Sequence, residues 1–174
     1  MIEAGVFQED ERLELIEGEI VTMPPIGFAH GFGVEHVNRL FSSLVRGRAL
    51  VWVQSPIQVA PNSRLEPDVA LLRPRPDLSP ESPPAASDVI LVVEVADTSI
   101  KYDRGAKRRL YARAGIPEYW IVNLPERVIE VYIEPSGGSY KQTRKLHRGE
   151  MLTLPAELGG SVEVNDILGK TGET

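Results

Sequence analysis

The sequence predicts an α+β domain with an α/β-type core, in which a mixed β-sheet is flanked by two main helices and followed by a C-terminal β-hairpin. Residues 34–45 and 102–114 carry apolar side chains at helical spacing. Val69 to Leu72 and Val89 to Val95 are apolar over nearly their whole length, which is typical of strands covered on both faces. Two further strand-like segments surround Ser136-Gly137-Gly138, and this pattern predicts the hairpin.

The length and composition are those of one globular domain. A chain of 174 residues can bury roughly two-thirds of the surface that it exposes when unfolded. Hydrophobic residues make up 42% and charged residues 25%, a balance that argues against global disorder. Because no internal repeat or clear interdomain linker divides the chain, we expect residues 1–174 to form a single domain.

Composition also excludes several functional classes. The chain has no cysteine, so it has no disulfide, thiolate nucleophile or cysteine-ligated metal. Its longest apolar runs are far shorter than the about 20 residues of a membrane span. The first twenty residues carry seven acids against one arginine, the reverse of a signal peptide. We therefore expect a cytoplasmic protein that does not enter the membrane, and the net charge of −6 counts against non-specific coating of nucleic acid.

The expected elements follow one another without a long gap until a proline-rich loop. In the first part they are a hairpin of Leu13 to Ile16 and Ile20 to Met23 around Glu17-Gly18, a helix from Val34 to Val45 with Gly47 just past its end, and short strands at Val51 to Gln54 and Ile57 to Ala60. The loop from Arg73 to Asp88 contains five prolines and separates the two strongest strand candidates.

After these strands we expect a second helix and four or more strands. They are the helix Tyr102 to Ala114 with a buried stripe of Ala106, Leu110 and Ala114, ended by Gly115 and Pro117, then a strand Glu118 to Asn123, the hairpin strands Arg127 to Ile133 and Ser139 to Leu146, and weak strands near Met151 and Val162.

Two acidic residues stand at the ends of the strongest strands. If the strands pair antiparallel around the proline loop, Asp68 at the start of one lies opposite Glu94 near the end of the other, with Cβ atoms about 5 Å apart. Two such carboxylates repel each other unless one is protonated or a cation lies between them. Magnesium is held by one or two carboxylates together with waters and phosphate oxygens. Solvated acids at strand ends are the alternative interpretation.

A set of short motifs carries a resemblance to a known family. In order they are Glu14-Leu15-Ile16-Glu17-Gly18-Glu19, His30, Gln54-Ser55-Pro56, Pro67-Asp68-Val69-Ala70, Val93-Glu94-Val95, Tyr102-Asp103 with Lys107, and Gly115-Ile116-Pro117-Glu118-Tyr119-Trp120. This set resembles the Uma-two family, restriction endonuclease-like proteins of the PD-(D/E)XK nuclease superfamily. The resemblance extends from about Glu14 to Asn123 and more loosely to the end, and it implies a restriction endonuclease-like fold.

The resemblance implies a metal site and a catalytic lysine. It assigns Asp68 and Glu94 to a catalytic Mg²⁺ or Mn²⁺, and suggests Glu14 as a third carboxylate, although Glu14 also fits a solvated hairpin acid. The motif's lysine should stand two residues after Glu94, where this chain has Ala96. We take Lys107 as its replacement, because Asp103, Lys107 and Tyr111 recur every four residues and share one helix face. An i,i+4 salt bridge to Asp103 is the alternative role for Lys107.

Further residues are candidates for substrate contacts. His30 at the helix start and Gln54 are carried over from the resemblance, a surface histidine being the alternative for His30. Lys101 is the second candidate for the missing lysine, and Arg104 and Arg108 belong to a basic helix that either faces a polyanion or faces solvent.

These features predict a metal-dependent endonuclease that hydrolyses DNA phosphodiester bonds. Because nucleases that act on duplexes often pair two sites, we expect a homo-oligomer, plausibly a dimer. The main alternative is a catalytically silent nucleic-acid-binding or assembly protein that keeps the fold, and Ala96 in the lysine position favours it. A metal-dependent hydrolase acting on another phosphodiester is the third interpretation.

Overall fold

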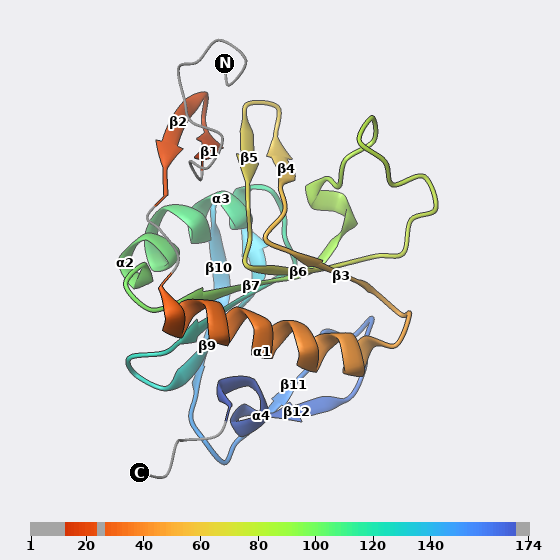
Figure 1. Cartoon of the computed structure of the whole chain (residues 1–174). Helices are drawn as coiled ribbons and strands as arrows, with labels where there is room; N and C mark the ends of the chain where they lie inside the picture. Colours follow the sequence, from red (N-terminus) through yellow and green to blue (C-terminus); the bar gives the residue numbers. More distant parts are fainter. Residues whose placement is uncertain (1–12, 24–26, 170–174) are drawn as a thin grey trace.

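The computed structural model describes residues 13–23 and 27–169 (Figure 1). Most of the acidic N-terminal stretch therefore lies outside the described residues. The described chain has a central six-stranded sheet, helices on both of its faces, and two smaller sheets. The expectation of a mixed α+β fold with two main helices and a C-terminal hairpin is confirmed.

The central sheet is mixed because one of its five strand pairs is parallel. Its strand order is β10 (Ser139–Leu146), β9 (Val128–Ser136), β8 (Glu118–Asn123), β7 (Val89–Ala96), β6 (Val69–Leu72) and β3 (Leu50–Val53). Strands β7 and β8 are parallel, and every other neighbouring pair is antiparallel. All eight residues of β7 are buried, which explains why its sequence shows no polar alternation.

The smaller sheets were only partly predicted. One has the order β2 (Glu19–Thr22), β1 (Leu13–Ile16), β5 (Ser63–Leu65) and β4 (Ile57–Ala60), and the other pairs β11 (Met151–Thr153) with β12 (Ser161–Glu163). Strand β5 was not predicted from the sequence, because its three residues are too few to show the alternation of polar and apolar side chains that marks a strand. The short helix α4 (Val164–Leu168) and the 3₁₀ turn Ala86–Asp88 were not expected either.

Helix α1 (Phe28–Val45) covers one face of the central sheet. Its buried residues are Val34, Val37, Phe41 and Val45, which confirms the apolar stripe read from the sequence. The helix starts at Phe28, six residues before the first residue of the stripe. Within the described residues, no helix is long and apolar enough to cross a membrane.

The second helical segment covers the other face and contains a wide turn. It consists of α2 (Ile100–Tyr102), a π-helical turn η2 (Asp103–Lys107) and α3 (Arg108–Arg113). The expected buried stripe is wrong in two of its three positions, because Ala106 and Ala114 are only half-buried. The buried face instead carries Asp103, Lys107, Leu110, Tyr111 and Ala112. In a π turn each backbone hydrogen bond spans five residues instead of the four of an α-helix, so the turn is wider. Such turns are often found at functional sites.

Candidate active site

The two acids expected to face each other do so. Strands β6 and β7 pair antiparallel with Val69 opposite Val93, so Asp68, one residue before β6, comes opposite Glu94. The backbone N–H of Asp68 donates to Glu94 Oε2 at 3.3 Å, and the N–H of Val95 donates to Asp68 Oδ2 at 2.9 Å. Both acids are buried, with 4% and 2% of their surface exposed. The alternative of solvated strand-end acids is therefore wrong.

Lys107 reaches this acid pair from the π turn. Its Nζ donates to Glu94 Oε1 at 2.9 Å and lies 3.3 Å from Glu14 Oε1. The lysine is 5% exposed, so the contact is made away from solvent. The geometry thus brings a lysine to the acids, although none follows Glu94 by two residues.

Glu14 comes to the same place from the small sheet. Its Oε1 accepts the backbone N–H of Glu66 at 3.1 Å, and its Oε2 accepts the hydroxyl of Tyr102 at 3.1 Å. The side chain is buried on β1 rather than solvated at a hairpin. The sequence could not place it, because its burial depends on β1 pairing with β5 across about fifty residues.

Two further residues of the buried helix face complete the cluster: Tyr111, and Asp103, which the sequence offered only as an alternative salt-bridge partner of Lys107. The hydroxyl of Tyr111 donates to Glu94 Oε1 at 2.7 Å. Asp103 is buried and accepts the hydroxyl of Ser99 through Oδ2 at 2.5 Å. The spacing of four residues from Lys107 was the only signal that could have pointed to them.

His30 and Gln54 lie next to Asp68. His30 Nε2, in the first turn of α1, is 3.0 Å from Asp68 Oδ1, so His30 belongs to the cluster rather than to the open surface. Gln54 donates its backbone N–H to the carbonyl of Asp68 at 3.1 Å. Its side-chain Nε2 is buried and has no hydrogen-bond partner in the part of the chain that the structure describes.

Four carboxyl groups share this buried cluster with one lysine, and the pKa values of Glu94, Asp103 and Asp68 are shifted. Burial raises the pKa of Glu94 well above its usual range, against the opposing charge of Lys107, and the Asp68 carboxylate adds to the rise. Burial also raises the pKa of Asp103. Burial alone would raise the pKa of Asp68, but the hydrogen bond with His30 and the charge of Lys107 outweigh it, so this pKa is lowered.

Lys107 and Tyr111, which donate hydrogen bonds to Glu94, keep their protons in these surroundings. Burial would lower the pKa of Lys107, but the carboxylates of Glu94 and Glu14 outweigh it and raise the pKa, so the ammonium stays charged. Burial raises the pKa of Tyr111, and the adjacent Glu94 adds to the rise, so the phenol keeps its proton. Lys107 and Tyr111 therefore both act as donors toward Glu94.

The three basic candidates of the second helical segment have other surroundings. Arg104 donates through Nε to both carboxylate oxygens of Glu130, at 3.1 and 2.9 Å, and through Nη2 to Glu126 at 2.8 Å. The guanidinium of Arg108 lies 5.4 Å from the ring centroid of Tyr132. No contact of the exposed Lys101 with the acid cluster is found among the described residues. The structure thus gives Arg104 and Arg108 partners on or beside β9 instead of bringing them to the acids.

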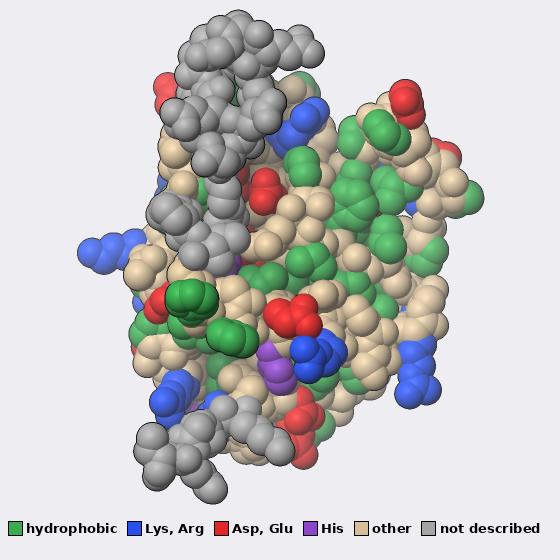
Figure 2. Space-filling view, viewed as in Figure 1, with side chains coloured by type: hydrophobic (Ala, Val, Ile, Leu, Met, Phe, Trp, Pro, Cys, Tyr) green, Lys and Arg blue, Asp and Glu red, His purple; other side chains and the backbone are tan. Residues whose placement is uncertain are grey.

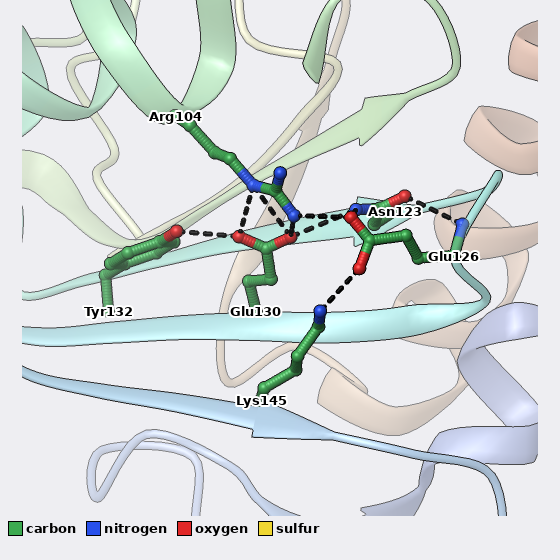
Figure 3. A network of polar contacts seen from close by, with 6 residues as sticks. All are labelled: Arg104, Asn123, Glu126, Glu130, Tyr132 and Lys145. Carbon is green, nitrogen blue, oxygen red and sulfur yellow. Dashed lines mark hydrogen bonds and ion pairs between the residues drawn. The ribbon is translucent and has the colours of Figure 1, made fainter. Parts of the chain in front are cut away.

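Figure 3 shows that Arg104 belongs to a network that ties the π turn to the central sheet. The buried Glu130 on β9 also accepts the amide of Asn123 at 3.0 Å and the hydroxyl of Tyr132 at 2.7 Å. Glu126 pairs with Arg104 and with Lys145 of β10. Since Arg104 precedes Lys107 in the same turn, the network holds the backbone that presents the lysine.

The acids fit an open magnesium site better than a closed cage. Among residues 13–23 and 27–169, no group of three or more histidine or acidic side chains is arranged to enclose a metal ion. Mg²⁺ needs only one or two carboxylates, and waters and substrate phosphates supply its other ligands. Asp68 and Glu94 provide such a pair of carboxylates. The excess of buried acids over lysine, and the raised pKa of Glu94, are conditions that a bound cation relieves.

Comparison with known proteins gives a family and a fold. The model of the Uma2 family, described as "Putative restriction endonuclease", matches residues 2–165. Among solved structures, a putative nuclease belonging to DUF820 from Anabaena variabilis ATCC 29413 is similar with a TM-score of 0.73 and 14% sequence identity, over 95% of this chain and 94% of that chain. No curated protein matches the chain significantly. At that identity the structural likeness establishes a shared fold, and the family match over nearly the whole sequence establishes that the chain belongs to the Uma2 (Uma-two) family.

Proposed function

We propose that the protein is a metal-dependent endonuclease that hydrolyses DNA phosphodiester bonds. The observation that carries this proposal is the buried pair Asp68 and Glu94 at facing strand ends, with the Nζ of Lys107 2.9 Å from Glu94. Acids and a charged lysine in one place are the groups that phosphoryl transfer requires, since its catalysis is mostly positioning and charge stabilisation. Membership of a family described as "Putative restriction endonuclease" supports DNA as the substrate.

Asp68 and Glu94 would hold Mg²⁺ or Mn²⁺. When bound there, such an ion lowers the pKa of a water and polarises the phosphate. The protein's own part is to keep both carboxylates in place, which the N–H groups of Asp68 and Val95 do by donating to them. His30 holds the second oxygen of Asp68, and Tyr111 fixes Glu94.

Lys107 would act as a cation rather than as a base, because its pKa is raised. In the reaction a water oxygen attacks phosphorus and gives up one proton, one P–O ester bond breaks, and the leaving alkoxide takes up a proton, so that the proton count balances. A protonated lysine beside Glu94 orients the attacking water and offsets the charge that develops on the phosphoryl oxygens. Glu14, 3.3 Å from the same ammonium, keeps Lys107 directed toward the acids.

Cleavage of supercoiled, linear and single-stranded DNA with Mg²⁺ or Mn²⁺ tests the proposal. We expect Asp68→Ala and Glu94→Ala to abolish cleavage and Lys107→Ala to reduce it at least a hundredfold, about the loss of one transition-state donor. Glu19→Ala and Lys141→Ala are the matched controls, because both side chains are exposed. They should cleave as the wild type does.

Two results would contradict the proposal. Cleavage that survives in Asp68→Ala would come from a contaminating nuclease. Wild-type protein that binds DNA but cleaves none of the three forms with either ion would favour a silent nucleic-acid-binding protein, the function that Ala96 in the motif position supports.

A further inference from the structure

The first turns of α1 expose two aromatic side chains. Phe28 is 91% and Phe32 is 75% exposed, and they stand four residues apart on one side of the helix. Figure 2 shows hydrophobic side chains gathered over this part of the molecule. Adjacent exposed aromatic side chains on a folded domain indicate an interaction surface, because each ring leaves a large apolar area in water.

This aromatic pair shares the first turns of α1 with a residue of the candidate active site. His30, between the two phenylalanines in sequence, points to Asp68 and lies 3.0 Å from it. The helix is also held close to the sheet, since a Cβ added at Gly33 would come within 2.7 Å of Val95, the residue after Glu94. Because Phe28 and Phe32 lie on the exposed side of α1 and His30 lies on the side that faces Asp68, a strand bound on the two rings has to pass around the start of the helix, which is about 10 Å across, to reach the acids.

Basic side chains border the aromatic pair on its other side. Phe32 lines a groove of about 590 Å³ between α1, the turn after β8 and α4. The charged side chains of its lining are Arg39, Arg127, Arg148 and Glu35, and His36 lies among them. Figure 2 shows histidine, basic and acidic side chains next to the hydrophobic ones.

The groove carries more positive charge than its single acid can offset. Glu35 pairs with Arg39 at 2.9 Å. Arg148 donates to the carbonyl of Gly169 at 2.7 Å, and its buried Nε has no partner among the described residues. Arg127 is exposed and forms no ion pair within the described part of the chain. The guanidinium of Arg127 and the remaining N–H groups of Arg148 can thus donate to an anionic ligand.

We infer that this surface binds unpaired nucleotides of a DNA strand as the strand leaves the acids. Bases would stack on Phe28 and Phe32, and phosphates would contact Arg127 and Arg148. Aromatic side chains beside a basic groove are how proteins bind single-stranded nucleic acid, because every base has a face that stacks. The inference rests on the proposed function and narrows its substrate to DNA that has an unpaired segment at the cleavage site.

A second copy of the chain fits the same surface less well. Most homodimer interfaces are two-fold, so each patch would meet its own copy. Arg127 and Arg148 of one copy would then approach those of the other, and like charges brought together in this way cost free energy. The phosphates of a DNA strand carry the charge opposite to that of these arginines, so a DNA strand fits the surface better.

Fluorescence anisotropy in EDTA tests the inference without cleavage. The probes are a labelled oligothymidylate and a blunt duplex of equal length, at several salt concentrations. For the oligothymidylate we expect Phe28→Ala/Phe32→Ala to raise Kd at least about 30-fold, the loss of two stacked bases, with little change for the duplex. Arg127→Ala should reduce the slope of log K against log salt by about 0.7. Met151→Ala, which removes an exposed apolar side chain elsewhere, is the control.

The conservative variant separates stacking from a merely apolar contact. Phe28→Leu/Phe32→Leu keeps the apolar surface and removes the rings, so it should bind oligothymidylate as weakly as the alanine variant. Leucine variants that bind as the wild type does would overturn the inference. A loss of self-association in the alanine variant, measured by sedimentation, would also overturn it and assign the surface to a dimer.

The inference and the proposed function fail in different ways. Wild-type protein that cleaves duplex DNA but binds oligothymidylate no better than the alanine variant would overturn the inference alone. Wild-type protein that neither binds nor cleaves any DNA would overturn both.

Discussion

Lys107 Nζ lies 2.9 Å from Glu94 Oε1, although the lysine is thirteen residues further along the chain. In the PD-(D/E)XK motif that the sequence resembles, the lysine stands two residues after the acid on the same strand, and here that position is Ala96. Glu94 and Ala96 lie on the same face of β7, and Ala96 packs in one core with Tyr111. The chain therefore brings a lysine to the acid from the neighbouring helical segment.

If Lys107 replaces the motif lysine, returning the lysine to the strand should restore part of the activity. We expect Lys107→Ala to lower DNA cleavage at least a hundredfold, and Ala96→Lys in the same chain to recover some of that loss. The new side chain would start on the strand face that carries Glu94 and enter space that Lys107 leaves. Cleavage rates of both variants with Mg²⁺ measure the effect.

Both variants must be shown to fold, because Ala96 is fully buried and a lysine there could disturb the core. Circular dichroism and the melting temperature show whether each variant keeps the fold. A folded double variant that cleaves no faster than Lys107→Ala would contradict the equivalence of the two positions.

Metal binding at Asp68 and Glu94 should stabilise the folded protein. A ligand that binds only the folded state at a hundred times its Kd adds about 2.7 kcal/mol, which is about 5–10 °C in Tm for a domain of this size. We therefore expect Mn²⁺ to raise the Tm of the wild type and not that of Asp68→Asn. Asp77→Asn, which changes an acid with 69% of its side chain exposed, is the control. An equal rise in Asp68→Asn would place the ion elsewhere.

The sequence could predict the parts of this site that local patterns determine. The pairing of Asp68 with Glu94 followed from two apolar strands around one loop, and the approach of Lys107 was suggested by its helical spacing from Tyr111. Glu14 could not be placed, since its burial depends on β1 pairing with β5, far along the chain.

The π turn is a second feature that could not be predicted from the sequence. A regular helix predicted Ala106 and Ala114 as buried, whereas the wide turn buries Asp103 and Lys107 among the acids. What keeps the turn in place is the contact of Arg104 with Glu130, which are 26 residues apart. Such long-range polar contacts leave no periodic signal in the sequence.

The Glu130 carboxylate should stabilise the fold at neutral pH and lose this effect in acid. Burial would raise its pKa, but the hydrogen bonds from Arg104, Asn123 and Tyr132 outweigh it and leave the pKa below its usual value of 4.5. A carboxyl group whose pKa is lowered in the folded state contributes stability above the unfolded pKa and loses it as the pH falls through the folded value. The contribution is therefore complete at pH 7, and it is lost progressively as the pH falls below the unfolded pKa and through the lower folded pKa.

We expect Glu130→Gln to lower the free energy of unfolding at pH 7 by about 1.5–3 kcal/mol, the value of a hydrogen bond to a charged group. The difference from the wild type should shrink as the pH falls toward 3, and urea unfolding at several pH values measures it. Faster amide hydrogen exchange at residues 103–107 would link the loss to the π turn. Glu163→Gln, a change at an exposed acid, is the control. A difference that does not vary with pH would show that the carboxylate charge is not the cause.

Gly33 should be required for the close contact between α1 and β7. Alanine there would gain about 1 kcal/mol of helix propensity, but its Cβ would lie 2.7 Å from Val95 Cγ1. Overpacking of this kind costs about 1–3 kcal/mol, so we expect Gly33→Ala to be neutral to destabilising by about 2 kcal/mol. Because α1 must move away from the strand, the contact of His30 with Asp68 should also loosen, and DNA cleavage should fall.

Gly105→Ala is the matched substitution, because Gly105 lies in the second helical segment and a Cβ there meets nothing within 4 Å. It should leave the free energy of unfolding unchanged or raise it by up to about 1 kcal/mol. Urea unfolding of the two variants gives the comparison. If Gly33→Ala is stabilised as much as Gly105→Ala, then α1 does not need glycine to approach β7, and the helix is free to place His30 without that contact.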